Sequence, residues 1–279
     1  MTEQDLIPKI IHFFWFGNGK KNEIYDRCRA SWEKFAPDYE IIEWGEENCD
    51  INEIKFVRQA YDAKKWAFVS DYFRLKKLYE FGGFYVDTDT EFNQSIDSLR
   101  KYTAVFPFEN KTDICAGFIA CRPGNKIIKE VLDTYTNYDF VASDGSYNTK
   151  YNIVVRITET LARNYPIVFN GRTQEQSDGT IIFSPNILML NVYDGSNITE
   201  HHYEASWWDP STEYFSYKNH LLKSYFESSA ITNAPSWKRA IYFMLFEPRT
   251  FRRKLAARLS SYPKLFSFIL KVYKSVKRS

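Results

Sequence analysis

The sequence predicts an α/β fold in which a mainly parallel sheet is flanked by helices on both faces. Apolar segments that end at Gly or Pro alternate along the chain with segments of helical periodicity, which is typical of parallel strands joined by helices. The chain has 279 residues, of which 44% are apolar and 18% aromatic, so it can bury a large core. This composition argues against low-complexity disorder.

The first half of the chain shows this alternation in order. Residues 7–17 (IPKIIHFFWFG) predict the opening strand. Residues 22–36 predict a helix, because their apolar side chains recur at helical spacing, and residues 39–44 (YEIIEW) predict a second strand. Two further helices are expected over residues 53–62 and 66–81.

The segment SDYFRLKKLYEFGGFYVDTDT, residues 70–90, is the best-marked part of the sequence. Its helix ends at Gly82, which fits a helix C-cap because glycine adopts the left-handed conformation without penalty. The apolar run that follows predicts a third strand over residues 84–90, and this strand ends with Asp87 and Asp89.

The second half of the chain continues the pattern. Residues 113–135 predict a strand, a Pro-Gly turn and a helix, and residues 152–165 predict another helix. Residues 180–190 (TIIFSPNILML) predict one or two strands. Residues 201–210 (HHYEASWWDP) predict a loop rich in side chains that bind ligands.

Two acids separated by one residue end the third predicted strand. In a strand, residues i and i+2 point to the same face, so Asp87 and Asp89 are expected to project together. Ligands of open parallel sheets bind beyond the carboxyl ends of the strands. Paired carboxylates there are suited to a hard divalent cation that neutralises phosphate oxygens. The alternative is a solvated strand end followed by a turn.

The preceding helix carries a second charged pair. Asp71 and Arg74 are three residues apart and therefore share a helix face. Arg74 is suited to pair with a phosphate or to fix Asp71, and Asp71 is suited to accept hydrogen bonds from sugar hydroxyls. The alternative is an ordinary ion pair on the helix surface.

Taken together, residues 70–90 resemble the sugar-binding region containing the D-x-D motif of glycosyltransferase family thirty-two. That family includes fungal Golgi mannosyltransferases and bacterial capsule enzymes, and it is related to the catalytic domains of clostridial glucosylating toxins. The joint pattern is S-D-x-x-R followed by G-G-x-Y-x-D-x-D, and the opening strand is similar as well. The resemblance covers residues 7–92 and extends more loosely to about 208.

The resemblance implies a GT-A fold and transfer of a sugar from a nucleotide donor with retention of anomeric configuration. Asp87 and Asp89 match the metal and donor site. Asp89 is expected to bind Mn²⁺ or Mg²⁺ directly, and Asp87 either joins it or reaches the ribose or the donor through water. Asp71 and Arg74 match the residues that hold the donor sugar, and Tyr85 matches an aromatic residue beside the donor.

Other donor contacts follow from the same resemblance. Trp15 matches a tryptophan that stacks on uracil, which favours a UDP-sugar; the alternative for Trp15 is a core aromatic residue. Ala116 and Gly117 are similar to a segment that lines the sugar pocket, where small residues allow close approach, although a plain core strand is equally consistent. His12 is expected to be structural.

The predicted loop after residue 200 is the second candidate region. Members of the family carry a His followed by Ser-Trp near here, so His201 or His202 is expected to complete the metal site. Ser206 is expected to contact phosphate, and Trp207 or its neighbour Trp208 to close over the donor. A surface loop without ligands is the alternative, and the nearby Glu204 competes as an oxygen ligand.

The charge distribution predicts a C-terminal extension. Residues 237–279 contain twelve Lys or Arg and one acid, so they carry +11, while the rest, with 25 basic and 34 acidic residues, carries −9. We expect a catalytic domain over residues 1–236 and a basic amphipathic helical tail over 237–279 that docks on an anionic membrane surface. The tail has no nucleic-acid module, so no nucleic-acid partner is expected; a solvated helical cap is the alternative.

The location follows from three absences in the sequence. No segment has the apolar length of a membrane span, the N-terminus lacks the pattern of a signal peptide, and the four cysteines are scattered. We therefore expect a cytoplasmic protein attached peripherally to the inner face of the cell membrane.

The sequence favours a metal-dependent retaining glycosyltransferase that moves a hexose or N-acetylhexosamine to a glycan acceptor, possibly lipid-linked, in bacterial capsule, exopolysaccharide or O-antigen synthesis. One alternative is a protein glycosyltransferase acting on a Ser, Thr or Tyr hydroxyl. A non-catalytic carbohydrate-binding protein is another. A phosphatase or nucleotidyltransferase would need further carboxylates for a second metal ion, and none is evident nearby.

Overall fold

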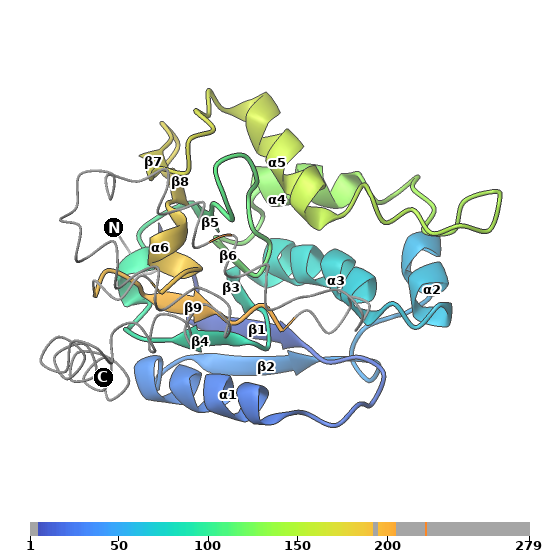
Figure 1. Ribbon diagram of the computed structural model, residues 1–279, viewed down its shortest axis with the longest axis horizontal. Coiled ribbons are helices and arrows are strands. Elements are labelled where there is room, and N and C mark those ends of the chain that lie inside the picture. Colours follow the sequence, from blue (N-terminus) through green and yellow to red (C-terminus); the bar gives the residue numbers. More distant parts are fainter. Residues whose placement is uncertain (1–4, 192–194, 205–220, 222–279) are drawn as a thin grey trace, which may run out of the picture. The chain divides into compact units, whose positions relative to one another are not determined.

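The structure is a computed structural model that describes residues 5–191, 195–204 and 221 (Figure 1). Within these residues, seven strands form one sheet and two more form a small second sheet. The elements in chain order are β1 (Ile10–Phe14), α1 (Glu23–Phe35), β2 (Glu40–Trp44), α2 (Lys55–Asp62), α3 (Trp66–Phe81), β3 (Gly83–Val86), β4 (Thr90–Phe92), the 3₁₀ turn η2 (Asp97–Leu99), β5 (Ala104–Pro107), β6 (Phe118–Cys121), α4 (Lys126–Asp133), α5 (Ile153–Asn164), β7 (Gln174–Glu175), β8 (Thr180–Phe183), α6 (Pro185–Leu188) and β9 (Thr199–His201).

The main sheet has the strand order β2-β1-β3-β6-β5-β8-β7. β1 runs parallel to β2 and β3, and β5 runs parallel to β8. β6 is antiparallel to both of its neighbours, β3 and β5, so those two strands run in the same direction. Five of the seven strands therefore share one direction, and the predicted mainly parallel α/β sheet is confirmed.

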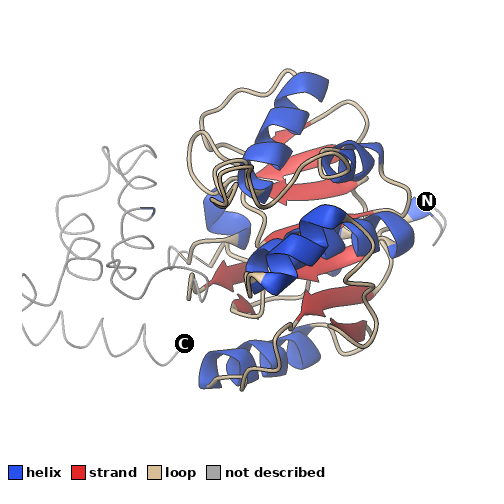
Figure 2. Ribbon diagram, turned by 90° about the vertical axis from the view of Figure 1, so that its right-hand side faces the viewer, coloured by secondary structure: helices blue, strands red, loops and turns tan. Residues whose placement is uncertain are grey.

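Helices cover both faces of the sheet, as predicted (Figure 2). Successive strand residues point to opposite faces. Phe13 contacts Trp32 of α1, whereas Phe14 contacts Phe16, whose ring in turn contacts Phe73 of α3. The central helix α3 is buried along most of its length and has the predicted bounds.

Gly82 ends α3 with a positive φ, as expected of a glycine cap, but not in the left-handed helical conformation. Its φ is 65° and its ψ is −157°. This region of backbone space is essentially restricted to glycine. An added Cβ would lie 2.7 Å from the ring nitrogen of Pro123, so the sharp change of direction into β3 also requires the absence of a side chain.

His12 is a structural residue, as expected. Its ring is fully buried, its Nδ1 accepts a hydrogen bond from Trp44 Nε1 at 3.0 Å, and its Nε2 donates to the Gly82 carbonyl at 2.8 Å. The ring therefore links β2 to the end of α3 in its neutral form.

Two predicted elements differ in the structure. The strand predicted over residues 84–90 ends at Val86, and the chain turns before β4 begins at Thr90. The apolar segment 180–190 forms β8 and then the short helix α6, because Pro185 fits the first turn of a helix, where its missing N–H is not needed.

The second sheet consists of β4 and β9 alone, and neither strand was predicted separately. β4 and β9 lie side by side (Figure 1) and pair antiparallel. Thr90 lies opposite His201 in this pair. α1 supports β4 from the side: Trp32 Nε1 donates to the Thr90 carbonyl at 2.7 Å, and Ser31 Oγ accepts from the Phe92 amide at 2.8 Å.

No helix in the described part of the chain is long and apolar enough to cross a membrane. The predicted tail, residues 237–279, lies outside the described residues.

Candidate active site

The two acids lie in a turn between β3 and β4, not on a strand. The Thr90 amide donates to the Asp87 carbonyl at 2.9 Å, which closes this turn. The Asp87 amide donates to the Gly117 carbonyl, also at 2.9 Å, and this bond continues the β3–β6 pairing for one residue. Both carboxylates still face the same point, although the cause is the turn and not strand alternation.

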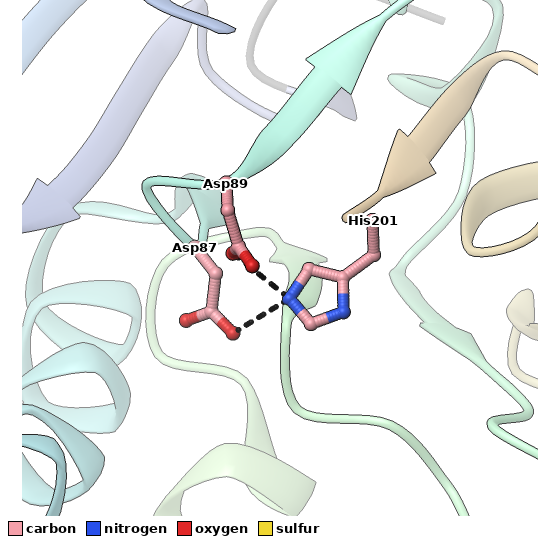
Figure 3. A group of neighbouring side chains, drawn as sticks. All are labelled: Asp87, Asp89 and His201. Atoms are coloured by element: carbon pink, nitrogen blue, oxygen red, sulfur yellow. Dashed lines mark ion pairs between the residues drawn. The ribbon is translucent and has the colours of Figure 1, made fainter. Parts of the chain in front are cut away.

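His201, the last residue of β9, lies at that point. Its Nε2 is 3.0 Å from Asp89 Oδ1 and 3.4 Å from Asp87 Oδ2 (Figure 3). One possible ligand atom from each of the three residues lies within 4.8 Å of the others. Two carboxylates and one imidazole form a set suited to Mn²⁺ or another divalent cation.

The charges of these groups also fit a cation. Burial would lower the pKa of His201, but the Asp89 and Asp87 carboxylates raise it to about 10. Burial would raise the pKa of Asp89, but His201 and the Glu204 amide lower it to about 2. For Asp87 the effect of burial is outweighed by Arg74 and His201, so its pKa is below the usual range. The two carboxylates thus stabilise a positive charge between them, and in this structure that charge is on the protonated imidazole of His201. Imidazole nitrogens are also common metal ligands.

Gly117 leaves room for this group. A Cβ at this position would lie 2.9 Å from Asp87 Oδ2 and 3.3 Å from His201 Nε2. The preceding residue, Ala116, uses its carbonyl to accept a hydrogen bond from Arg74 Nη1 at 2.9 Å. Both residues lie in the bend that leads into β6, and both lie beside the site.

Arg74 joins the helix pair to the acids. Its guanidinium is 3.0 Å from Asp71 Oδ1 and 3.3 Å from Asp87 Oδ1, and it lies over the Tyr85 ring, 4.3 Å from the centroid. The Tyr85 hydroxyl donates to Asp87. Asp71 and Arg74 have side chains only 9% and 6% exposed, so this is not the ordinary surface ion pair.

The position of Arg74 is set by its own helix. Ser70, four residues earlier, accepts from Arg74 through its carbonyl at 3.4 Å and through its hydroxyl at 2.8 Å. The sequence did not lead us to predict a role for Ser70. Ser70 and Arg74 are nevertheless four residues apart in the S-D-x-x-R pattern, a spacing that brings two side chains together on one helix face. Burial raises the pKa of Asp71 to about 6, against the attraction of Arg74.

Trp15 directly follows β1, at the edge of the sheet where Asp87 follows the neighbouring β3. The side chain is partly exposed. Its Nε1 donates to the Gly19 carbonyl at 2.8 Å, and its ring lies 6.0 Å from that of Tyr25. This contact fixes the indole at the edge of the sheet, not within the core.

The structure separates the two adjacent histidines. The His202 ring turns away from the acids: its Nε2 lies 2.8 Å from Glu91 Oε2 and 2.7 Å from Arg27 Nη2. Only its backbone reaches the site, where its amide donates to the Asp89 carbonyl at 2.9 Å. Glu204 likewise contributes its amide, which donates to Asp89 Oδ2 at 2.7 Å, while its carboxylate accepts from Asn22.

Ser206, Trp207 and Trp208 lie outside the described residues. The predicted loop also begins one residue later than expected, because His201 belongs to β9.

Comparisons with known proteins agree with this geometry. Residues 23–106 match the family model of the glycosyltransferase sugar-binding region containing the DXD motif. A curated relative, inositol phosphoceramide mannosyltransferase 3 of Schizosaccharomyces pombe, is 27% identical over 141 residues. That match covers 48% of this chain and 38% of the relative, so the chain spans well under half of the relative's length.

Two solved structures with partial similarity to this chain are named as glycosyltransferases. The PaToxG glycosyltransferase has a TM-score of 0.48 at 21% identity, over 58% of this chain and 70% of the other. A glycosyltransferase involved in the glycosylation of the major capsid of PBCV-1 has a TM-score of 0.40 at 12% identity, over 77% of this chain and 99% of the other.

The matched region contains Asp71, Arg74, Asp87 and Asp89, the residues that form the charged part of the site. Residues 23–106 of this chain are therefore similar to the glycosyltransferase sugar-binding region that contains the DXD motif.

Proposed function

We propose that this chain is a metal-dependent retaining glycosyltransferase that moves a hexose or N-acetylhexosamine from a nucleotide sugar to a glycan acceptor. The observation that carries the proposal is the convergence of two charged groups at one edge of the sheet. The triad of Asp87, Asp89 and His201 is suited to a cation, and the buried Asp71–Arg74 pair touches it through Asp87.

In the proposed reaction, the site supplies positive charge to the leaving group in two ways. A divalent cation held by Asp87, Asp89 and His201 would supply positive charge to the departing diphosphate. Arg74 adds a second positive charge that is already fixed in place by Ser70 and the Ala116 carbonyl, and such preorganised charge is effective because it needs no reorientation during the reaction.

Asp71 is suited to hold the donor sugar. Its side chain is largely buried and paired with Arg74, which favours a fixed hydrogen-bond acceptor over a free nucleophile. We therefore propose retention by a front-face mechanism, in which the leaving phosphate helps to deprotonate the acceptor hydroxyl. Mass spectrometry that detected a covalent sugar on Asp71, or on any other side chain, would contradict this mechanism.

The identities of the sugar donor and of the acceptor are more specific proposals. The position of Trp15 at the strand edge supports stacking on a base, and the resemblance of this residue favours a UDP-sugar. The name of the curated relative, an inositol phosphoceramide mannosyltransferase, supports an acceptor with a lipid part and adds mannose to the hexoses worth testing. We propose a lipid-linked glycan of bacterial capsule, exopolysaccharide or O-antigen synthesis.

Membrane docking through residues 237–279 fits such an acceptor. The proposal rests on the +11 charge and the interleaved apolar residues of this tail, since each cation near an anionic surface contributes on the order of 1 kcal/mol. Deleting 237–279 should move the protein from the membrane fraction to the soluble fraction. Unchanged partitioning would favour a tail that only caps the catalytic domain.

The first test is release of nucleoside diphosphate from a panel of UDP- and GDP-sugars, with Mn²⁺ and with EDTA. We expect slow hydrolysis of one donor, lost with EDTA and in Asp89→Asn. Asp133→Asn is the matched control, because Asp133 is an exposed acid of α4 that pairs with Lys129. A second stage compares lipid-linked sugars with Ser, Thr and Tyr peptides; transfer to a peptide alone would favour a protein glycosyltransferase.

A donor panel with neither turnover nor metal-dependent binding would overturn the proposal and favour a non-catalytic carbohydrate-binding protein.

A further inference from the structure

Residues 202–204 form a short strap around Asp89, one of the proposed cation ligands. The His202 amide donates to the Asp89 carbonyl at 2.9 Å, and the Glu204 amide donates to Asp89 Oδ2 at 2.7 Å. The other carboxylate oxygen, Oδ1, lies 3.0 Å from His201 Nε2 (Figure 3). The strap therefore holds both the backbone and the side chain of Asp89, and it leaves Oδ1 directed at the proposed cation site.

The middle residue of the strap, Tyr203, has an unfavourable backbone conformation. Its φ is 56°, in the left-handed region that bulky residues rarely adopt. The chain turns at this residue, and the Glu204 amide then reaches the same aspartate that the His202 amide binds. The Tyr203 ring is buried and packs against the His201 imidazole, with ring centroids 4.1 Å apart. A strained conformation persists only where the surrounding contacts hold it, so the end of the strap needs a fixed partner.

Asn22 supplies that partner from the start of α1. Its Nδ2 donates to Glu204 Oε2 at 2.6 Å, while its Oδ1 accepts from the Tyr25 amide at 2.9 Å and caps the helix. One side chain thus fastens the strap to the first turn of α1. Capping alone does not require asparagine, because Asp and Ser cap helices equally well. Asp, however, has no donor for a carboxylate, and the Ser side chain ends one bond earlier.

The same bond accounts for the orientation of the Glu204 carboxylate. From the sequence, Glu204 competes with the histidines as an oxygen ligand. In the structure its carboxylate binds Asn22, and among the described residues the group able to hold a metal ion consists of Asp87, Asp89 and His201. Glu204 therefore reaches the site through its amide and is fixed through its side chain.

We propose that Asn22 is a positioning residue of the cation site: by holding Glu204, it keeps the strap closed and the Asp89 carboxylate oriented to bind a divalent cation. The inference rests on the proposed function, because the orientation of Asp89 matters for a cation only if Asp89 is a ligand. Groups that orient a metal ligand raise the affinity, since the ion then binds a ligand that is already in place. Without the bond from Asn22, the strain at Tyr203 favours an open strap, and cation binding has to close it.

The first measurement is the affinity for Mn²⁺, by isothermal titration calorimetry. Asn22→Ser keeps a good cap but loses the amide donor, so we expect Mn²⁺ to bind about three- to tenfold more weakly, the effect of losing one hydrogen bond. Asn125→Ser is the matched control, because Asn125 caps α4 in the same way, with its Oδ1 accepting from the Ile128 amide at 3.1 Å. The control should bind Mn²⁺ with the affinity of the unaltered protein.

A rescue experiment separates positioning from a general effect on the fold. The double variant Asn22→Asp/Glu204→Gln exchanges the donor and the acceptor, and it keeps both the helix cap and the net charge. It should recover most of the Mn²⁺ affinity, whereas Asn22→Asp alone, with two carboxylates facing each other, should not.

The second measurement needs no metal. In metal-free protein, exchange of the Glu204 amide hydrogen with solvent, followed by ¹⁵N NMR, should be about three- to tenfold faster in Asn22→Ser, because this amide exchanges from the open strap. An Asn22 that only capped α1 would leave both this exchange and the Mn²⁺ affinity unchanged in Asn22→Ser.

The proposal is overturned if Asn22→Ser leaves either quantity unchanged, if Asn22→Ser does not fold by circular dichroism, or if the double variant binds Mn²⁺ no better than Asn22→Asp. An unaltered protein that bound no Mn²⁺ would overturn the proposed function, and the exchange measurement would still decide whether Asn22 holds the strap. The two failures are therefore distinguishable.

Discussion

At the scale of single residues, two adjacent histidines have different surroundings and so form a natural pair of variants. His201 lies between two carboxylates, whereas His202 contacts Glu91 and Arg27. We expect His201→Ala to weaken Mn²⁺ binding by more than about tenfold, since even the loss of outer-shell partners costs that much. His202→Ala should bind Mn²⁺ with nearly the same affinity as the unaltered protein. Isothermal titration calorimetry at pH 8 measures both, and an equal loss in the two variants would contradict the assignment of His201.

A second residue-scale prediction concerns acid. Burial lowers the pKa of His12 to about 4, below its usual value near 6.5. Because the folded-state pKa is the lower one, the contribution of the neutral ring is complete above pH 6.5 and is lost as the pH falls toward 4. From pH 7 to pH 5 this loss is about 2 kcal/mol.

Urea unfolding of the unaltered protein and of His12→Gln measures this effect. The variant has no group to titrate here, so the difference in unfolding free energy between the two proteins should shrink by that amount between pH 7 and pH 5. A difference that stays constant would mean that His12 is charged in the folded state.

The sequence could identify the acids but not choose between the histidines. Asp71 and Arg74 share a helix face by their spacing alone, and the structure places them in contact. His201 ends a strand of three residues and His202 directly follows it, and so short an element has no periodicity to show which side chain turns inward. The choice depends on pairing with β4, which is a long-range contact.

At the scale of elements, the sequence correctly predicted that Asp87 and Asp89 lie together, but it predicted a strand where the structure has a turn between β3 and β4. The segment FYVDTDT alternates and contains β-branched residues, which favour strands. The bond from the Thr90 amide to the Asp87 carbonyl nevertheless closes a turn within it. Asp is a common turn residue because its side chain tolerates such backbone conformations, and this competing preference prevails.

The α3–β3 connection gives an element-scale prediction with a matched control. Gly82→Ala places a Cβ in a glycine-only conformation and 2.7 Å from the Pro123 ring nitrogen. Gly124→Ala shares the positive φ, at 69°, but its Cβ would meet nothing within 4 Å. We expect a loss of unfolding free energy of about 3 kcal/mol or more for Gly82→Ala and about 1–2 kcal/mol for Gly124→Ala. Urea denaturation measures both values, and equal losses would show that contact with Pro123 adds nothing.

At the scale of the whole molecule, the alternation of elements was enough to predict the sheet and the helices on its two faces. It did not predict the two strands of the main sheet, β6 and β7, that run opposite to the other five. β6 follows β5 in sequence and pairs with it, but it also inserts between β5 and β3, and local periodicity carries no information on strand order. The second sheet was missed for the same reason, since β4 and β9 are short and far apart in sequence.

The site joins distant parts of the molecule, so metal binding should stabilise the fold as a whole. A ligand that binds only the folded state adds about 2.7 kcal/mol at a hundred times its dissociation constant. For a domain of this size that corresponds to a rise in Tm of about 5–10 °C. Scanning calorimetry with Mn²⁺ and with EDTA measures the rise, which should be absent in Asp89→Asn. A similar rise in that variant would place the metal elsewhere.

The pairing of Thr90 with His201 also sets when the proposed cation site can first form during synthesis of the chain. Once Asp89 has been added, a ribosome must add about 110 more residues before it reaches His201, which at ordinary elongation rates takes about 5–20 s. During that interval α3, β3 and both acids are already present, but His201 is not. An unfinished chain therefore cannot bring Asp87, Asp89 and His201 together. A chain truncated before residue 199 would keep the strands of the main sheet but would lack His201 and the three-residue cation site proposed here.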